Sequence, residues 1–208
     1  MANILWTLLY FFLVVDVAFI VVAGIVFTYF LFASRFMRSS PPVPTVGKVK
    51  QGMLNAVEEY IKGKPHANVV DLGSGWGSLL LPLAAKYPQH TFIGYERVRL
   101  PYIISRFRAR KLPNVHIYRQ DFFTADFSDV DAIMCFQLAA IMQKLLSYLR
   151  QHISKTVRIY VNRYPFKDLI PLEKISIEGD YAVYYVYDIK PDKSVHQHEA
   201  ILKSGEWS

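Results

Sequence analysis

The stretch Val69-Val70-Asp71-Leu72-Gly73-Ser74-Gly75-Trp76-Gly77-Ser78 decides the fold. An apolar, β-branched run ends in an acid, glycines then recur at every second position, and a helix-forming run follows over residues 79–86. This order is typical of a strand, a tight glycine turn and a helix. Glycine tolerates positive φ and lets a ligand approach the backbone closely, and a helix start offers free N–H groups. The stretch therefore predicts a ligand site at the end of a strand.

The spacing of the acid and the glycines indicates the kind of ligand. A dinucleotide-binding turn reads G-x-G-x-x-G, whereas this chain reads D-x-G-x-G-x-G from Asp71. An acid before the first glycine can pair with a cation, which a pyrophosphate site would not favour. The pattern resembles motif I of the Rossmann-like methyltransferases that use S-adenosyl-L-methionine (SAM). The resemblance implies that Asp71 stands near the amino-acid end of the cofactor, and that the turn contacts it through Gly73, Ser74, Gly75 and Gly77.

Strands and helices alternate along the rest of the chain. The apolar patterns predict helices at residues 46–62, 79–86, 100–111 and 139–152, and strands at 91–95, 115–119, 132–136 and 157–161. Two further strands, 175–177 and 182–189, flank a turn at Glu178-Gly179-Asp180. Alternation indicates a parallel sheet covered on both faces, and the last two strands indicate an antiparallel hairpin at its edge. The predicted fold class is α/β, with the Rossmann-like sheet of class I methyltransferases.

Acids end three successive predicted strands. Ligands of open parallel sheets bind beyond the carboxyl ends of the strands, and Glu96 and Asp121 stand there together with Asp71. Glu96 can accept both ribose hydroxyls, and Asp121 can accept the exocyclic amine of adenine, with Phe122 beside the ring. A single acid at such a place is more often merely solvated, but three in succession favour an adenosyl cofactor, SAM. The predicted cofactor residues beyond the turn are Glu96, Gln120, Asp121, Phe122 and Phe136.

An apolar segment opens the chain. From Ile4 to Phe32 the one charged residue is Asp16, and a helix of this length spans about 43 Å, more than the hydrocarbon core of a bilayer. No basic residue precedes the run, which is also too long for the core of a cleavable signal peptide. The segment therefore predicts a single-pass membrane helix. Arg35 and Arg38 follow it, so the positive-inside rule places the following domain on the cytoplasmic side, or on the equivalent side of an organelle membrane.

Composition divides the chain further. We expect a transmembrane helix at residues 4–33, a proline-rich linker at 34–45, a SAM-dependent methyltransferase domain at 46–190 and a tail at 191–208. All 24 basic residues and 16 of the 17 acids lie beyond residue 33, which leaves that part with a net charge of +8. Such a charge suits an anionic membrane surface or nucleic acid. The six scattered histidines and the single cysteine, Cys135, predict no metal site and no disulfide within the chain.

Several stretches together resemble one family. The chain is similar to the membrane-anchored lysine methyltransferases related to the enzymes that modify the ATP synthase c-subunit and the adenine nucleotide translocase. The similarity covers about residues 41–189 and is carried by residues 42–45, 71–75, 94–96, 163–166 and 187–188. The chain departs from the family at Trp76-Gly77-Ser78 and at Leu169-Ile170-Pro171, which concerns the substrate more than the cofactor.

The resemblance implies methyl transfer to a lysine of a membrane or membrane-associated protein. Aromatic faces can hold the cationic head of a lysine. The candidates to line the acceptor site are the rings of Tyr95, Phe136, Tyr164 and Phe166, with Gln137 as a polar guide; Gln137, Tyr164 and Phe166 are the predicted catalytic residues. Residues 136–138 lack the Asn/Asp-Pro-Pro-aromatic signature of amide and adenine-amine methylases. The alternatives are a lipid or quinone methyltransferase, a non-catalytic membrane-anchored module of the same fold, and an RNA methyltransferase using the arginines of residues 97–110. Nucleic acid is the less favoured partner, because those arginines on one helix are more simply a solvated face.

Overall fold

A computed structural model describes residues 2–36, 47–177 and 182–192 of the chain. The elements in chain order are α1 (Ala2–Phe36), α2 (Gly47–Ile61), β1 (Asn68–Leu72), α3 (Leu80–Lys86), β2 (Thr91–Tyr95), α4 (Arg99–Ala109), β3 (Val115–Tyr118), η1 (Phe122–Thr124), β4 (Ala132–Cys135), α5 (Ala139–His152), β5 (Val157–Asn162), β6 (Glu173–Ile177) and β7 (Ala182–Ile189). The chain forms two compact units, residues 1–41 and residues 42–208.

The first unit consists of the helix α1. Within the described residues, its segment Trp6–Leu31 is the single stretch that is long and apolar enough to cross a bilayer. None of the side chains of this segment is buried, and Phe19, for example, is 73% exposed. A helix that is apolar all round is suited to lipid or to a protein interior rather than to water.

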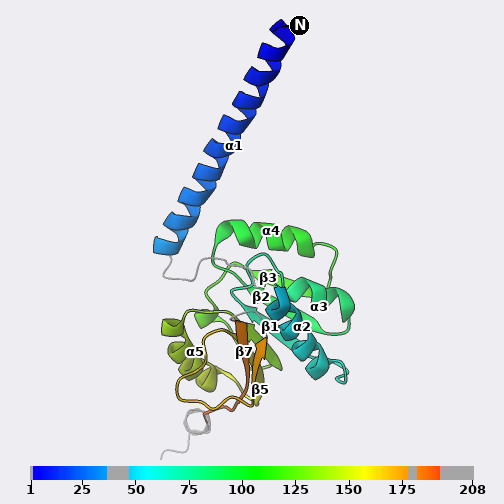
Figure 1. Ribbon diagram of the computed structural model, residues 1–208. Helices are drawn as coiled ribbons and strands as arrows, with labels where there is room; N and C mark the ends of the chain where they lie inside the picture. Colours follow the sequence, from blue (N-terminus) through cyan, green and yellow to red (C-terminus); the bar gives the residue numbers. More distant parts are fainter. Residues whose placement is uncertain (1, 37–46, 178–181, 193–208) are drawn as a thin grey trace, which may run out of the picture. The chain divides into compact units, whose positions relative to one another are not determined.

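The second unit is built on one seven-stranded sheet in the order β3-β2-β1-β4-β5-β7-β6 (Figure 1). The five strands from β3 to β5 are parallel, while β7 pairs antiparallel with both β5 and β6. The strand order reverses between β1 and β4. Here Leu72, the last residue of β1, pairs with Tyr95 of β2 on one side and with Cys135 of β4 on the other. The carboxyl ends of these strands therefore lie side by side at the switch point, where such sheets bind ligands.

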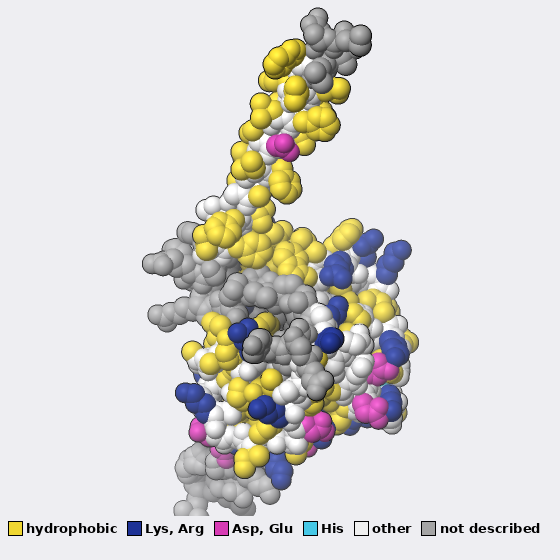
Figure 2. Space-filling model, in the orientation of Figure 1, with side chains coloured by type: hydrophobic (Ala, Val, Ile, Leu, Met, Phe, Trp, Pro, Cys, Tyr) yellow, Lys and Arg dark blue, Asp and Glu magenta, His cyan; other side chains and the backbone are white. Residues whose placement is uncertain are grey.

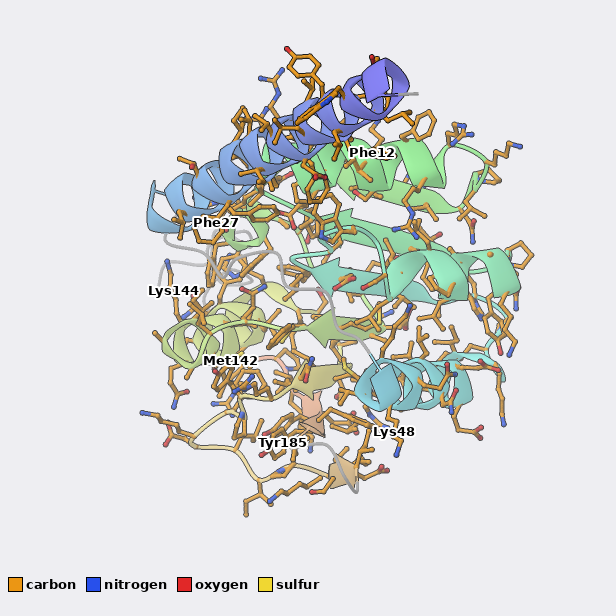
Figure 3. All side chains as sticks on the ribbon, turned by 45° about the horizontal axis from the view of Figure 1, so that its top comes forward. Phe12, Phe27, Lys48, Met142, Lys144 and Tyr185 are labelled. Atoms are coloured by element: carbon orange, nitrogen blue, oxygen red, sulfur yellow. The ribbon has the colours of Figure 1, made fainter. Side chains whose placement is uncertain are left out.

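Helices cover both faces of this sheet. Residues of α2, α3 and α4 pack on one face around Val69, whereas α5 packs on the other face around Val70 and Leu72. Figure 3 labels two residues of α5: Met142 is buried toward the sheet, and Lys144 is exposed on the outer side of the helix. Val69 and Val70 face opposite sides of the sheet because successive side chains of a strand point to opposite faces.

The predicted fold class is confirmed, with the parallel sheet and the antiparallel hairpin at its end. The strands 91–95 and 182–189 and the helix 139–152 have the predicted bounds. Other elements differ by a residue or two; β6, for example, begins at Glu173 rather than at Ile175. The predicted turn at 178–180 and most of the predicted linker and tail lie outside the described residues.

Candidate active site

The glycine turn after β1 is held against the end of β2. The amides of Gly73 and Ser74 both donate to the Tyr95 carbonyl, at 2.9 and 3.0 Å. The turn can approach β2 this closely because residue 94 is glycine: a Cβ there would lie 2.8 Å from the Ser74 Oγ. The two neighbouring strand ends therefore form one continuous surface of backbone.

Gln137 reaches this turn from the other side of the switch point. Its Nε2 donates to the Leu72 carbonyl at 2.8 Å, and the side chain is buried. Gly73 has a φ of +80°, and a Cβ at that position would lie 2.6 Å from the same Nε2. The conformation and the approach of the amide both favour glycine at residue 73. Gln137 therefore positions the turn from the end of β4.

Asp71 carries the unusual electrostatics of the site. It is only 5% exposed, and among the described residues no donor and no cation is bonded to its carboxylate. Burial, with a smaller contribution from the charge of nearby Glu96, raises the pKa of Asp71 to about 7. A buried carboxylate without a partner is unfavourable, and a ligand cation would relieve this.

Glu96, just beyond β2, holds the backbone at the same edge. Its two oxygens accept from the amides of Gly75, at 2.9 Å, and Val98, at 2.6 Å. Burial raises the pKa of Glu96, and these backbone donors oppose that rise. Each carboxylate oxygen has two lone pairs, so Glu96 can accept further hydrogen bonds, such as those of a diol.

The predicted residues after β3 also serve the local structure. The Asp121 Oδ1 accepts from the Phe123 amide at 3.1 Å and caps η1, while its Oδ2 lies 3.2 Å from the Arg97 Nη1. Gln120 donates to the carbonyl and hydroxyl of Thr124. Phe122 is buried in the core beside α5, with 7% of its surface exposed. These side chains lie at the carboxyl end of β3, next to that of β2.

An aromatic group lies beyond β5. Tyr164 is half-buried, whereas Phe166 is buried with its ring edge-on to Tyr187, 5.1 Å between centroids. Tyr185, labelled on β7 in Figure 3, is half-buried with its ring 6.4 Å from that of Tyr187. Phe136, after β4, is also half-buried. Tyr164, Tyr185 and Phe136 thus have surface left for a ligand, with Phe166 supporting the group from within.

The backbone is strained where this aromatic group begins. Arg163 has a φ of +72°, and the Tyr164 amide donates to the Asn162 carbonyl across it, at 2.9 Å. The left-handed region is costly for a residue with a Cβ, and such strain concentrates at functional sites. Sequence reasoning missed this feature. It named Tyr187 as a point of family resemblance but missed Tyr185, although a spacing of two residues in a strand would have placed both on one face.

The predicted site residues thus fall into connected groups. Asp71, Glu96 and Gln137 surround the glycine turn and are linked to it by hydrogen bonds or by charge. Arg97 connects this group to Asp121. Among the described residues, no group of three or more metal-ligating side chains is present.

The residues of this edge fit SAM. The ammonium of its methionine part suits the unpaired carboxylate of Asp71. Its ribose hydroxyls suit the remaining acceptor capacity of Glu96. The glycine turn leaves room for a ligand at Gly75, where a Cβ would meet no atom closer than 3.9 Å. The Ser74 Oγ is buried without a hydrogen-bond partner among the described residues, which leaves a further polar group at the turn.

Solved structures share the fold of this domain. An RNA methyltransferase from Salinibacter ruber in complex with S-adenosyl-L-homocysteine has a TM-score of 0.61 and 21% identity over 72% of this chain and 95% of that chain. The magnesium protoporphyrin IX methyltransferase of Synechocystis with bound SAM has a TM-score of 0.54 and 16% identity, over 71% of this chain and 86% of that one. The domain thus has the fold of SAM-dependent methyltransferases, and the residues of its candidate site fit the same cofactor.

The sequence comparison also gives a matching family model. Residues 71–173 match the model described as ANTKMT methyltransferase domain, which confirms the predicted resemblance. The chain is also 25% identical, over 122 residues, to "Probable ribosomal RNA small subunit methyltransferase A" of Methanosphaera stadtmanae. That match covers 59% of this chain and 41% of the relative, so the chain spans less than half the length of that protein.

Proposed function

We propose that this enzyme transfers the methyl group of SAM to the side-chain amine of a lysine in a membrane or membrane-associated protein. The observation that carries the proposal is the match of residues 71–173 to the ANTKMT methyltransferase domain. It agrees with the family resemblance in the glycine turn, in Gly94-Tyr95-Glu96 and in residues 163–166.

The acceptor side of the site supports an amine rather than an amide or a nucleobase. Phe136-Gln137-Leu138 follows β4, where amide and adenine-amine methylases have an Asn/Asp-Pro-Pro-aromatic stretch. Half-buried aromatic rings at Phe136, Tyr164 and Tyr185 line the sheet edge beyond β4 and β5. Aromatic faces attract a cationic head group within about 6 Å of the ring.

The chemistry requires little of the protein beyond positioning and exclusion of water. Bound SAM supplies an electrophilic methyl group on a sulfonium. A free lysine has a pKa of about 10.4, so the acceptor must first release a proton to solvent, and desolvation of the amine beside the cationic sulfonium would lower its pKa. Gln137 is buried and can guide the amine with its amide oxygen, because its nitrogen is engaged with the Leu72 carbonyl. Orientation and water exclusion then account for most of the catalysis.

The membrane part of the proposal rests on α1. Its segment Trp6–Leu31 is long enough to cross a bilayer, and Arg35 and Arg38 favour the cytoplasmic side, or its organelle equivalent, for the catalytic domain. Tethering to the membrane raises the effective concentration of a substrate held in the same bilayer.

A labelling experiment tests the substrate class. The full chain is incubated with methyl-labelled SAM and a membrane extract, beside the Asp71→Ala variant as the inactive control. We expect label in a protein band and its recovery on lysine after digestion. Label in the organic phase would instead indicate a lipid or quinone acceptor. Label on another amino acid, or none above the Asp71→Ala control, would reject the proposal.

RNA is the second candidate substrate. The relative from Methanosphaera stadtmanae is described as a ribosomal RNA methyltransferase, and α4 carries an arginine cluster. The same experiment separates the two candidates, because label that disappears on ribonuclease treatment would come from RNA. Protein-bound label would survive the ribonuclease.

A further inference from the structure

The outer side of α4 exposes apolar side chains. Ile103 is 48% and Phe107 is 63% exposed, whereas Pro101, Ser105 and Ala109 are buried against the sheet. With 3.6 residues per turn, Ile103 and Phe107 lie opposite the buried side. A surface helix normally has one apolar stripe, facing the core. The second stripe on α4 therefore faces away from the domain to which the helix belongs.

Basic side chains surround this stripe. From Arg97 to Gln120 the chain has seven lysines and arginines and no acid. Arg99, Arg106 and Arg110 are exposed, and no carboxylate of the described residues forms an ion pair with them. Figure 2 shows Lys and Arg side chains beside hydrophobic ones over α4. We call the apolar pair Ile103 and Phe107, with Arg99, Arg106 and Arg110, the α4 outer face.

The arginines are held close to the apolar surface. The Arg110 guanidinium lies 4.0 Å from the centroid of the Phe107 ring and donates to the Phe107 carbonyl at 2.9 Å. Arg106 donates to the Tyr102 hydroxyl at 2.6 Å. The stems of such side chains cover apolar surface, and each guanidinium has five donors, so both heads keep donors for anions beside these bonds. The face thus presents cations and apolar groups in one layer.

We propose that the α4 outer face docks on the surface of a membrane that contains anionic lipid. Helices with this composition lie in the interface, with their apolar side chains at the acyl boundary and their cations on the phosphates. An aliphatic Ile103 at the centre of the face suits acyl chains better than the stacked bases of a nucleic acid, which aromatic platforms favour. The inference rests on the proposed membrane anchorage through α1.

Docking would bring the catalytic edge to the membrane. Helix α4 begins three residues after Glu96, so its first turn adjoins the strand end that carries the candidate cofactor site. The site would then lie beside the bilayer surface, where the lysine of a membrane protein emerges.

The test uses the full chain in lipid vesicles with a fluorescent probe on Ile103→Cys. Cys135 is buried and burial raises the pKa of its thiol, so the new exposed cysteine is labelled selectively. A matched control carries the probe on Ser147→Cys, an exposed position of α5. Vesicles contain phosphatidylcholine with or without phosphatidylglycerol, together with a headgroup-level quencher. Flotation of the vesicles reports insertion of α1 separately.

We expect the probe at residue 103, but not at 147, to be quenched in phosphatidylglycerol vesicles. Each basic residue at an anionic surface favours docking about fivefold. Combined Arg99→Glu, Arg106→Glu and Arg110→Glu should therefore weaken docking about a hundredfold or more. The same charge change at Arg150, Lys174 and Lys190, which are exposed on other elements, should leave the quenching nearly intact.

Three results would overturn the inference. Flotation with an unquenched probe at residue 103 would reject the α4 docking alone. Failure to float would reject the anchorage in the proposed function and the docking with it. A stronger response of the probe to an RNA oligonucleotide than to anionic vesicles would assign the face to nucleic acid.

Discussion

Replacement of Asp71 by Asn should stabilise the cofactor-free protein and weaken cofactor binding at the same time. The pKa of Asp71 is raised from 3.8 to about 7, so the folded state binds more protons than the unfolded state between these values. Stability therefore falls as the pH rises through this window, and the whole cost is present above pH 7. At 1.36 kcal/mol per pH unit, the cost is about 4 kcal/mol.

Asp71→Asn removes this cost because a neutral amide replaces the carboxylate. For a domain of this size, about 4 kcal/mol corresponds to a rise in melting temperature on the order of 10 °C at pH 8. Near pH 4 the wild-type carboxyl is protonated in the folded state, so the two proteins should melt at similar temperatures. Affinity for S-adenosylhomocysteine should fall about tenfold to a hundredfold, because its ammonium loses a charged acceptor.

Two measurements check these effects. Thermal melts of the full chain in detergent at pH 4 and pH 8 report the stability, and titration calorimetry of S-adenosylhomocysteine at pH 8 reports the affinity. The affinity of the wild type for S-adenosylhomocysteine should rise between pH 6 and pH 8 as Asp71 ionises. The affinity of the Asp71→Asn variant should not rise in this way. Glu59→Gln, at an exposed position of α2, serves as the control and should change neither quantity. A variant that melts lower than wild type at pH 8, or that binds with unchanged affinity, would refute the reasoning about Asp71.

Three further substitutions test the neighbouring groups. Glu96→Gln should stabilise the protein less than Asp71→Asn at pH 8. One of the amides of Gly75 and Val98 loses its acceptor, and this cost of about 1–3 kcal/mol offsets the relief of the buried charge; a larger rise in melting temperature than that of Asp71→Asn would argue against this. Gly73→Ala should cost at least about 1–2 kcal/mol in denaturant unfolding, because φ is +80° and the new Cβ would also meet the Gln137 Nε2. Gly63→Ala, where a Cβ meets nothing within 4 Å, should be nearly neutral; equal effects would contradict this account of Gly73. Arg163→Gly should be more stable than Arg163→Ala by about 1 kcal/mol, because only glycine relieves the left-handed backbone; the reverse order would show that residue 163 is not strained.

The sequence was sufficient for the sheet and the turn because their signals are local. β-branched runs, regularly spaced glycines and helical periodicity gave the strands 91–95 and 182–189 and the helix 139–152 with their observed bounds. The start of β6 was missed because Glu173 and Lys174 are exposed on an edge strand and carry no apolar signal. Such polar edge residues are common in sheets that avoid aggregation.

The contacts that complete the site were beyond local reasoning. The bond between Gln137 and the Leu72 carbonyl joins residues 65 positions apart. The three acids could be placed at one sheet edge from strand order, but the unpaired state of Asp71 and the backbone bonds of Glu96 depend on how that edge packs. The positive φ of Arg163 could not be predicted from the sequence, because glycine is the residue that indicates such a conformation and residue 163 is arginine.

A crystal structure of the full chain with S-adenosylhomocysteine tests the central claim most directly. We expect the ligand at the carboxyl ends of β1 and β2, with its ammonium bonded to Asp71 and its ribose hydroxyls bonded to Glu96. A ligand bound elsewhere, or one whose ammonium lies away from Asp71, would show that this edge of the sheet is not the cofactor site.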